Sequence, residues 1–583
     1  MTAMCCCALG AARLAADDPR PGGPPLPAEL LTTEVRSPLG MVAAADLQAA
    51  RAGARMLEMG GNAIDAAVAA TFALGVVDPT CAGLGGQALT LVRLASGREL
   101  VVDGSAAVPM AADPAKLQRL KDRGQLYGHA VAATPTMLAA MTHLLRRYGT
   151  MSLAQTMQPA IELAERGHTL RPYVEDDFRE KAAKMVENDY LSELFLRSGH
   201  GPWPSGCLLQ QPVLAATMRQ IAVEGEAVFY RGAIAAEIEA DMTAHGGYVH
   251  RSDLAAVRVV ERAPLRARYR DVEVVSIPPP GGGDVLLGAL QILSTFPPEL
   301  LEQDSVDRLH VLIEAVRIAM HDAGVSPVPL PLDPTWARRR ARLVRFREAL
   351  QDDEISSPGV PVARPMAGGT SQISAVDRWG NAVALTATLG SSALAASPKL
   401  GFQYSSLLSG FDYTNPESKN HLAPLRAPHT TIAPVLLLRN GALTAVLGGA
   451  GSARIPSSLV AVISNLVDRG FGLGEAVAAP RVVVDPPEQT RVLLELAGGI
   501  TAAHADALEA RGFSNQFRLT FPPRPIDICA FGGVNAVMVE PGGVLVGVGD
   551  PRRQGGAAAP WAAGAPASHG GLPPHPTPRL AAR

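Results

Sequence analysis

The chain has 583 residues, of which 47% are hydrophobic and 18% are charged, and its formal net charge is −3 at pH 7. This composition excludes an intrinsically disordered protein and supplies enough apolar material for a sizeable core, although length alone does not fix the number of domains. The small net charge shows that the chain as a whole has no excess of basic residues, so nucleic acid is not an expected partner.

The spacing of cysteine and histidine argues against a metal centre. Of the six cysteines, three are adjacent at 5–7 and the others, Cys81, Cys207 and Cys529, are scattered. No Cys-x-x-Cys pair and no His-Glu-x-x-His helix is present in the sequence. We therefore expect no metal, no other cofactor and no disulfide framework.

Both ends of the chain are predicted to be disordered. Residues 1–39 form a proline-rich leader, and its apolar run at 4–16 is interrupted by Arg13. This run matches a secretory signal poorly and is too short to span a bilayer, so the compartment of the protein stays open. Residues 555–583, rich in Gly, Ala and Pro, form the predicted tail.

Ordered structure is predicted to begin with a short apolar strand at 40–44 and a helix at 46–59 that ends on two glycines. A second helix, at 62–77, is apolar nearly all round and is therefore expected to be buried. The glycine cluster 83–86 then leads into a strand at 88–94. Its spacing fits no phosphate-binding pattern, so these glycines are expected to allow close backbone packing.

A basic segment lies within a connecting loop that is predicted at 325–369. The predicted helix 336–350 carries six arginines, at 338, 339, 340, 342, 345 and 347. Such a helix could dock on an acidic surface or on nucleic acid. A solvated linker helix is the favoured interpretation, because the rest of the chain supplies no matching basic patch.

The sequence around Thr370 predicts a β-hairpin. Two glycines precede a strand at 370–377, a type I′-like turn at Gly380-Asn381 and a second strand at 382–388. A threonine hydroxyl is a weak nucleophile unless a base takes its proton. Cleavage of the Gly369–Thr370 bond would supply that base, because the new α-amine titrates near neutrality. On this motif alone, a simple loop-to-strand entry is the favoured interpretation.

A second glycine-rich stretch, at 448–455, follows two predicted strands at 435–438 and 443–447 and opens a helix at 456–468. Backbone amides at the point where such a loop meets a helix can hold an oxyanion. A tight strand-to-helix turn is the alternative interpretation.

Several stretches resemble the γ-glutamyltranspeptidase (glutathione hydrolase) family of N-terminal-nucleophile hydrolases. Residues 370–388 are similar to the start of that family's small subunit, and residues 40–93, with Gly-Gly-Asn-Ala-Ile-Asp-Ala-Ala at their centre, to the opening of its large subunit. The resemblance implies an α/β (α+β) fold, the four-layer αββα sandwich. It also implies self-cleavage into a large subunit (40–369) and a small catalytic subunit (370–554), which form a heterodimer.

The resemblance further implies the roles of individual residues. Thr370 would attack the Gly369 carbonyl to cut the chain, and then a substrate amide, forming an acyl-enzyme that is released to water or to an amine acceptor. Thr388 matches a threonine that hydrogen-bonds the nucleophile hydroxyl, and Gly451 and Ser452 match two oxyanion amides. Glutathione is the family's usual substrate, and family members are usually exported or anchored in a membrane.

The substrate-binding positions depart from the family pattern. Ser105 stands where an arginine grips the substrate carboxylate, and Asp412 is the nearest replacement for an aspartate whose place is taken by Gly410. Gly390 replaces an asparagine, and Arg426 with Ala427 replaces a pair of serines. An acyl group other than γ-glutamyl, such as that of a dicarboxylic monoamide, therefore stays open, with Arg426 as its carboxylate ligand. A pseudoenzyme is the second alternative, and a protein that binds partners through its basic helix is a distant third.

Overall fold

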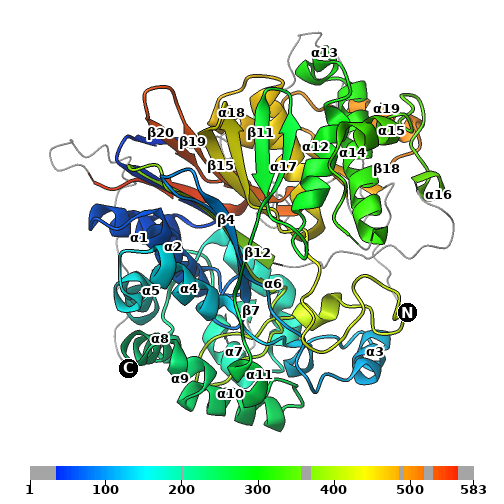
Figure 1. Cartoon of the computed structure of the whole chain (residues 1–583). Helices are drawn as coiled ribbons and strands as arrows, with labels where there is room; N and C mark the ends of the chain where they lie inside the picture. The colour runs from blue at the N-terminus through cyan, green and yellow to red at the C-terminus, as the bar shows by residue number, and fades with distance from the viewer. Residues whose placement is uncertain are drawn as a thin grey trace, which may run out of the picture.

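The computed structural model describes residues 34–197, 201–326, 328–355, 369–484, 491–517 and 529–561. Two seven-stranded antiparallel sheets pack face to face, and helices cover their outer surfaces (Figure 1). The first sheet, called the β12 sheet, has the order β21 (Gly556–Ala558), β2 (Gly40–Ala44), β12 (Gly369–Asp377), β13 (Ala382–Gly390), β3 (Gln87–Arg93), β4 (Glu99–Gly104) and β9 (Val260–Arg262). The second, the β15 sheet, has the order β1 (Val35–Ser37), β20 (Leu545–Val548), β19 (Gly533–Val539), β15 (Ala442–Ala450), β14 (Val435–Arg439), β11 (Val272–Ser276) and β10 (Leu265–Tyr269).

Three apolar cores separate four layers, which confirms the predicted αββα sandwich. Side chains such as Leu91, Val376 and Leu436 fill the space between the two sheets. A second core joins the outer face of the β12 sheet to the helices α1 (Leu47–Glu58), α2 (Ala63–Val77), α4 (Met137–Tyr148), α5 (Leu153–Arg166), α8 (Pro212–Glu224), α9 (Glu226–Tyr230), α10 (Ala233–Ala244) and α11 (Arg251–Ala255). A third joins the β15 sheet to α12 (Gly283–Leu293), α14 (Val306–Val325), α15 (Pro334–Ala341), α17 (Ile455–Val467), α18 (Leu473–Ala478) and α19 (Ala502–Ala510).

Smaller elements extend these layers. They are the helices α3 (Pro114–Asp122), α6 (Pro172–Met185), α7 (Asp189–Phe195), α13 (Pro298–Glu302) and α16 (Asp352–Ile355), a sheet of β16 (Val482–Val484), β17 (Arg491–Leu494) and β18 (Ser514–Phe517), and the pairs β5 (His168–Thr169) with β8 (Leu208–Leu209) and β6 (Leu196–Arg197) with β7 (Gly201–Pro202). Within the described ranges, no helix is long and apolar enough to cross a membrane.

The predicted N-terminal helices are confirmed. The Asp46 carboxylate accepts hydrogen bonds from the first amides of α1, and Asn62 and Asp65 form a capping box at the start of α2. Every residue of α2 is buried, as its all-round apolar sequence predicts. The glycines beyond α2 also pack closely as expected, since a Cβ on Gly85 would lie 2.2 Å from the Gln403 carbonyl oxygen.

The β12–β13 hairpin is confirmed, but the prediction of a type I′ turn is wrong. Gly380 has a positive φ of 91° and Asn381 does not, whereas a type I′ turn needs positive φ at both central residues. The turn is instead closed by the amide of Gly380 donating to the carbonyl of Asp377 at 3.2 Å. The Asp377 carboxylate also accepts the amides of Trp379 and Asn381.

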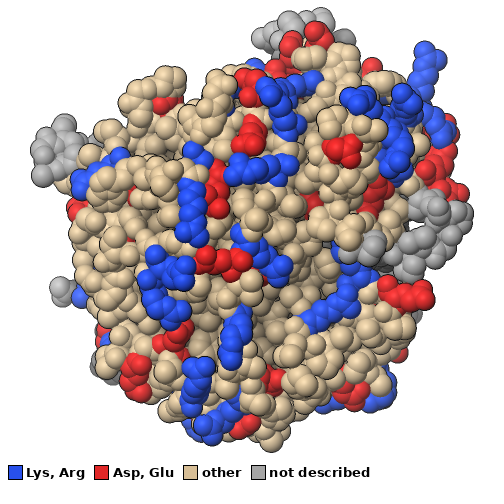
Figure 2. All heavy atoms as spheres, viewed as in Figure 1, with Lys and Arg blue, Asp and Glu red and all other residues tan. Residues whose placement is uncertain are grey.

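The predicted basic helix 336–350 is also wrong in extent and environment. Helix α15 ends at Ala341, and Trp336 and Ala337 on it are buried, so it is not a solvated linker. Arg340 pairs with Asp322 at 2.6 Å, and Arg345 pairs with Glu354. On the face shown in Figure 2, basic and acidic side chains are interspersed.

Short strands occupy two places that were predicted to be disordered. In the predicted leader, β1 pairs with β20, with Val35 opposite Gly547. In the predicted tail, β21 pairs with β2, with Ala558 opposite Val42. Both pairings use partners about 500 residues away in the chain, which local composition does not report. The remainder of both predicted regions, residues 1–33 and 562–583, lies outside the described residues.

Candidate active site

Thr370 lies at the start of β12, at an irregularity in the strand pairing. Gly369 pairs with Gly390 and Ser371 with Ala387, and the register shifts between these two pairs, so Thr370 sits in a bulge. Alternate residues of the strand face opposite sides: Val376 contacts the other sheet and Ile373 the helices. Thr370 is 4% exposed, and Arg553 donates to its carbonyl oxygen at 2.8 Å.

Thr388 lies across the hairpin from Thr370, as the sequence analysis expects. The Thr370 hydroxyl donates to the Thr388 hydroxyl oxygen at 3.4 Å, and the Thr388 hydroxyl donates to the Gly369 carbonyl at 2.6 Å. The amide of Gly390 donates to the Thr388 oxygen at 2.8 Å and fixes its orientation. The carbonyl of the bond predicted to break therefore has a donor aimed at it.

The loop Gly451-Ser452 joins β15 to α17 through a short 3₁₀ turn, Ser452–Arg454. Gly451 has a φ of 134°, and a Cβ there would lie 2.8 Å from the Cα of Gly532, so the position requires glycine. Ser452 also has a positive φ, of 59°, which is uncommon for a residue with a side chain and can mark a functional constraint.

This loop and Thr370 lie at the same end of the two facing sheets. A Cβ on Gly448 of β15 would lie 2.3 Å from the side chain of Gln372, two residues after Thr370. The Thr431 hydroxyl donates to the Ser452 carbonyl at 2.7 Å. The four predicted catalytic residues are thus on neighbouring ends of β12, β13 and β15.

The predicted substrate-binding residues are only partly brought together. The Ser105 hydroxyl and amide both donate to Asp103, which also pairs with Arg262 at 2.7 Å. The Asp412 carboxylate accepts amides of its own turn. Arg426 donates to the carbonyl oxygens of Lys419 and His421.

The backbone nevertheless places these segments side by side. The amide of Val108, three residues after Ser105, donates to the Arg426 carbonyl, and the amide of Leu422 donates to the Asp412 carbonyl. The segment that contains Arg426 borders a cavity of about 700 Å³ whose lining also includes Lys419 and His429. A smaller cavity of about 60 Å³ shares Lys419 and His429 and reaches Thr431, which bonds to Ser452.

The cavity is lined by two cationic side chains, Lys419 and Arg426, and by the carboxylate of Glu417. Burial, with the nearby Lys419 and Arg426 cations, lowers the pKa of His429 to about 4, so its imidazole is neutral near pH 7. Burial lowers the pKa of Lys419 and raises that of Asp284 at the start of α12. Sequence reasoning missed Lys419, His429 and Asp284. The first two lie in an irregular segment without periodicity, and only the glycine run before Asp284 marked the third.

Cys81 lies directly against the residue before Thr370. A Cβ on Gly369 would lie 2.7 Å from its sulfur. Burial raises the pKa of this thiol to about 12, with the Asp78 and Asp177 carboxylates adding to the shift. Cys81 is therefore a neutral thiol near pH 7 and does not compete with Thr370 as a nucleophile.

One group in the described part of the chain has the residue types of a metal site: His129, Asp241 and His245. The two imidazole rings are stacked, with centroids 4.5 Å apart and planes inclined by 18°. The Asp241 carboxylate accepts hydrogen bonds from His129 and Tyr404.

Comparisons with known proteins agree on one group. A family model described as Gamma-glutamyltranspeptidase matches residues 49–560. The chain is 33% identical over 539 residues to the Acylase ACY 1 proenzyme of Pseudomonas sp. (strain V22), covering 88% of this chain and 92% of that protein. It is 31% identical over 553 residues to the Glutathione hydrolase proenzyme of Escherichia coli (strain K12), covering 89% and 91%. The solved structure of cephalosporin acylase from Bacillus halodurans matches with a TM-score of 0.80 and 29% identity, covering 91% of this chain and 97% of that chain.

Proposed function

Because the chain belongs to the gamma-glutamyltranspeptidase family of N-terminal-nucleophile hydrolases, we propose that it is a self-processing amidohydrolase and acyltransferase with Thr370 as its nucleophile. The observation that carries the proposal is the hydroxyl pair of Thr370 and Thr388, in which Thr388 also donates to the Gly369 carbonyl. Names of relatives that include the word proenzyme support self-processing.

In the processing step, the Thr370 oxygen attacks the Gly369 carbonyl carbon, and the hydrogen bond from Thr388 stabilises the charge that develops on the carbonyl oxygen. The C–N bond breaks as the nitrogen takes the proton that the Thr370 hydroxyl gives up, which leaves an ester between Gly369 and the Thr370 oxygen. Water hydrolyses the ester. The products are a large fragment ending at Gly369 and a small fragment beginning at Thr370.

In turnover, the free α-amine of Thr370 takes the hydroxyl proton while the oxygen attacks a substrate amide. We assign the backbone amides of Gly451 and Ser452 as the donors that hold the oxyanion, and a serine side chain at 452 is compatible because the backbone supplies the donor. The leaving amine receives the proton. Water or an amine acceptor then attacks the acyl ester and regenerates Thr370.

The acyl group that this chain's residues favour ends in a carboxylate, as in a dicarboxylic monoamide. The cavity of about 700 Å³ is lined by the cations Lys419 and Arg426 and by one carboxylate, Glu417. The two cations suit a substrate carboxylate through charge-assisted hydrogen bonds. Ser105 cannot supply the charge of the family's arginine. The names of two similar proteins, which contain the word acylase, support an acylase activity. A γ-glutamyl amide such as glutathione is the second candidate, favoured by the E. coli relative.

The test is an intact-mass measurement of the purified protein and of a Thr370→Ala variant, each also run on a denaturing gel. We expect two fragments with a new N-terminus at Thr370, absent from the variant. The cut protein is then assayed with glutaryl-p-nitroanilide and γ-glutamyl-p-nitroanilide, and we expect the glutaryl amide to react faster. A single uncut chain in both proteins would overturn the proposal and favour a pseudoenzyme that keeps the fold as a binding module.

A further inference from the structure

Arg553 contacts the backbone of the nucleophile residue from a distant part of the chain. It ends a 3₁₀ turn, Pro551–Arg553, and is 7% exposed. Its Nη1 donates to the Thr370 carbonyl oxygen at 2.8 Å, and its guanidinium lies 5.6 Å from the ring of Tyr173. A cation is therefore held, out of water, against the residue that becomes a chain terminus in the proposed function.

The strand ladders hold Thr370 less firmly than the residues that follow it. On one side, pairing with β2 begins only at Ile373, opposite Ala44. On the other side, Thr370 falls in the bulge between the Gly369 and Ser371 pairs. Once the bond to Gly369 is cut, the covalent restraint on that side is also lost, so the hydrogen bond from Arg553 restrains the new terminus.

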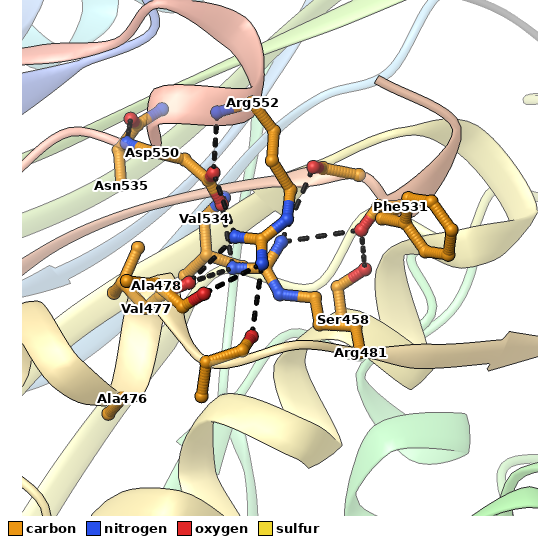
Figure 3. Close-up of polar contacts among 12 residues, drawn as sticks. Ser458, Ala476, Val477, Ala478, Arg481, Phe531, Val534, Asn535, Asp550 and Arg552 are labelled. Carbon is orange, nitrogen blue, oxygen red and sulfur yellow. Dashed lines mark hydrogen bonds and ion pairs between the residues drawn. The ribbon is translucent and has the colours of Figure 1, made fainter. Parts of the chain in front are cut away.

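The 3₁₀ turn that carries Arg553 is fixed by a buried ionic network (Figure 3). Asp550 pairs with Arg481 at 2.7 Å, and Arg552 pairs with Glu495 at 2.7 Å; each of these four side chains is at most 1% exposed. Asn535 ties the network to β12, because it accepts from the Asp550 amide and donates to the Gln372 carbonyl. The guanidinium of Arg553 is thereby set at a fixed position relative to Thr370.

This position bears on the α-amine of Thr370, which the proposed function uses as a base. The nitrogen and carbonyl oxygen of one residue are about 3 Å apart, so Nη1 lies within about 6 Å of the amine. A cation at this distance disfavours protonation. On the helix side of β12, the Asp78 carboxylate, bonded to Ser371 at 2.7 Å, acts in the opposite sense.

Other charged groups near Arg553 and β12 are paired. Asp177 pairs with Lys181 at 2.6 Å. Arg171, which donates to the Arg553 carbonyl at 2.9 Å, pairs with Asp46 at 2.5 Å. Cys81 is a neutral thiol. Within the described residues, Arg553 is thus a cation that opposes Asp78 across the strand.

We propose that Arg553 is a positioning residue that holds the Thr370 terminus after cleavage and, through its charge, keeps the terminal amine unprotonated near neutral pH. The inference rests on the proposed function, because it needs the cut at Thr370. It adds to the proposed site a residue, Arg553, that lies far from Thr370 in the sequence.

The test compares two variants that separate charge from hydrogen bonding. Arg553→Gln keeps an N–H donor without the charge, and Arg553→Lys keeps the charge. The pH dependence of kcat/KM is measured with the p-nitroanilide that the wild type hydrolyses, and its acid limb reports the amine of the free enzyme. We expect the acid limb to move up by about one pH unit in the Gln variant and to stay in place in the Lys variant. Arg378→Gln, at the exposed far end of the hairpin, is the matched control for loss of one charge and should not move it.

The outcomes distinguish a failure of this inference from a failure of the proposed self-processing function. If the wild type is not cut at Thr370, both fall. If the wild type is cut and active and the Gln variant has the same acid limb, Arg553 does not act on the amine and only this inference falls. If the Gln variant does not fold by thermal unfolding, Arg553→Met, which also removes the charge, decides: an acid limb raised by about one pH unit supports the inference, and one within the error of the wild type overturns it.

Discussion

At the scale of single residues, the Thr388 hydroxyl is the group on which the proposed processing depends most directly. It donates to the Gly369 carbonyl at 2.6 Å and accepts from Thr370. We expect Thr388→Val, which keeps the shape and removes the hydroxyl, to slow self-cleavage by about 10²-fold, the usual cost of losing one such donor. Time courses of intact mass from freshly folded protein measure the rate.

The matched control is Thr90→Val on the adjacent strand β3. Thr90 is fully buried in the same sheet, and its hydroxyl has no hydrogen-bond partner in the described structure. Cleavage of this variant should keep the wild-type rate. Equal rates for all three proteins would show that the Thr388 hydroxyl plays no part.

His310 is a buried imidazole that the fold keeps neutral. It is fully buried on α14 against Phe513, and burial, reinforced by the Arg511 cation, lowers its pKa from 6.5 to about 4. Between these values the unfolded chain binds the extra proton, so stability falls as the pH falls. The cost at pH 5 is about 2 kcal/mol. We therefore measure the unfolding free energy at pH 7.5 and at pH 5 by urea denaturation. The decrease between these two pH values should be about 2 kcal/mol smaller for His310→Phe than for the wild type. Identical losses would contradict the assignment.

At the scale of elements, Asp377 joins the hairpin turn to the start of α2. Its carboxylate accepts the amides of Trp379, Asn381 and Ala63, the last at 2.9 Å. Asp377→Ala leaves the buried amide of Ala63 and the partly buried amides of Trp379 and Asn381 without this acceptor, and we expect it to lower the unfolding free energy by about 2–3 kcal/mol. Asp271→Ala, in an exposed turn where the carboxylate pairs with Arg439, should cost less than about 1 kcal/mol. Denaturant titration of both variants makes the comparison, and equal costs would argue against a joining role.

Helices and strands that neighbouring residues in the sequence specify could be predicted. Strands that depend on pairing with a strand far away in the sequence could not. Helix α2 and the strands of the hairpin follow from apolar pattern, caps and glycine position. Strands β1 and β21 are three residues long and exist only because β20 and β2 present free edges. Helix α15 ends at Ala341 although the arginines continue to residue 347. Its buried side chains, Trp336 and Ala337, lie at its start, and the pattern of arginines does not predict its end.

The same division holds in the site. Thr370, Thr388 and the Gly451 loop lie in sequence patterns that indicate strands and turns, and the structure brings them together as expected. Lys419 and His429 lie in an irregular segment whose place depends on backbone contacts with the chain near Val108. Such contacts have no period in the sequence, so the cationic side of the cavity emerges only from the tertiary structure.

At the scale of the whole molecule, the proposed cut divides the chain but not the sheets. In the β12 sheet, β12 and β13 lie between β2 and β3, which precede the cut. In the β15 sheet, β14 pairs with β11 and β20 with β1 in the same way. Strands of the small fragment are therefore hydrogen-bonded on both sides to strands of the large one, and the core between the sheets contains residues of both.

The fragments should therefore stay together after processing. We expect both in a single peak of size-exclusion chromatography whose mass by light scattering equals the 60.8 kDa of the uncut chain, or a whole multiple of it. Thr370→Ala protein should elute at the same volume, because the cut opens no sheet. Only denaturant should separate the two fragments, since separation breaks every ladder between them and exposes the shared core. Release of the small fragment in native buffer would show that the interleaved strands do not hold the cut protein together.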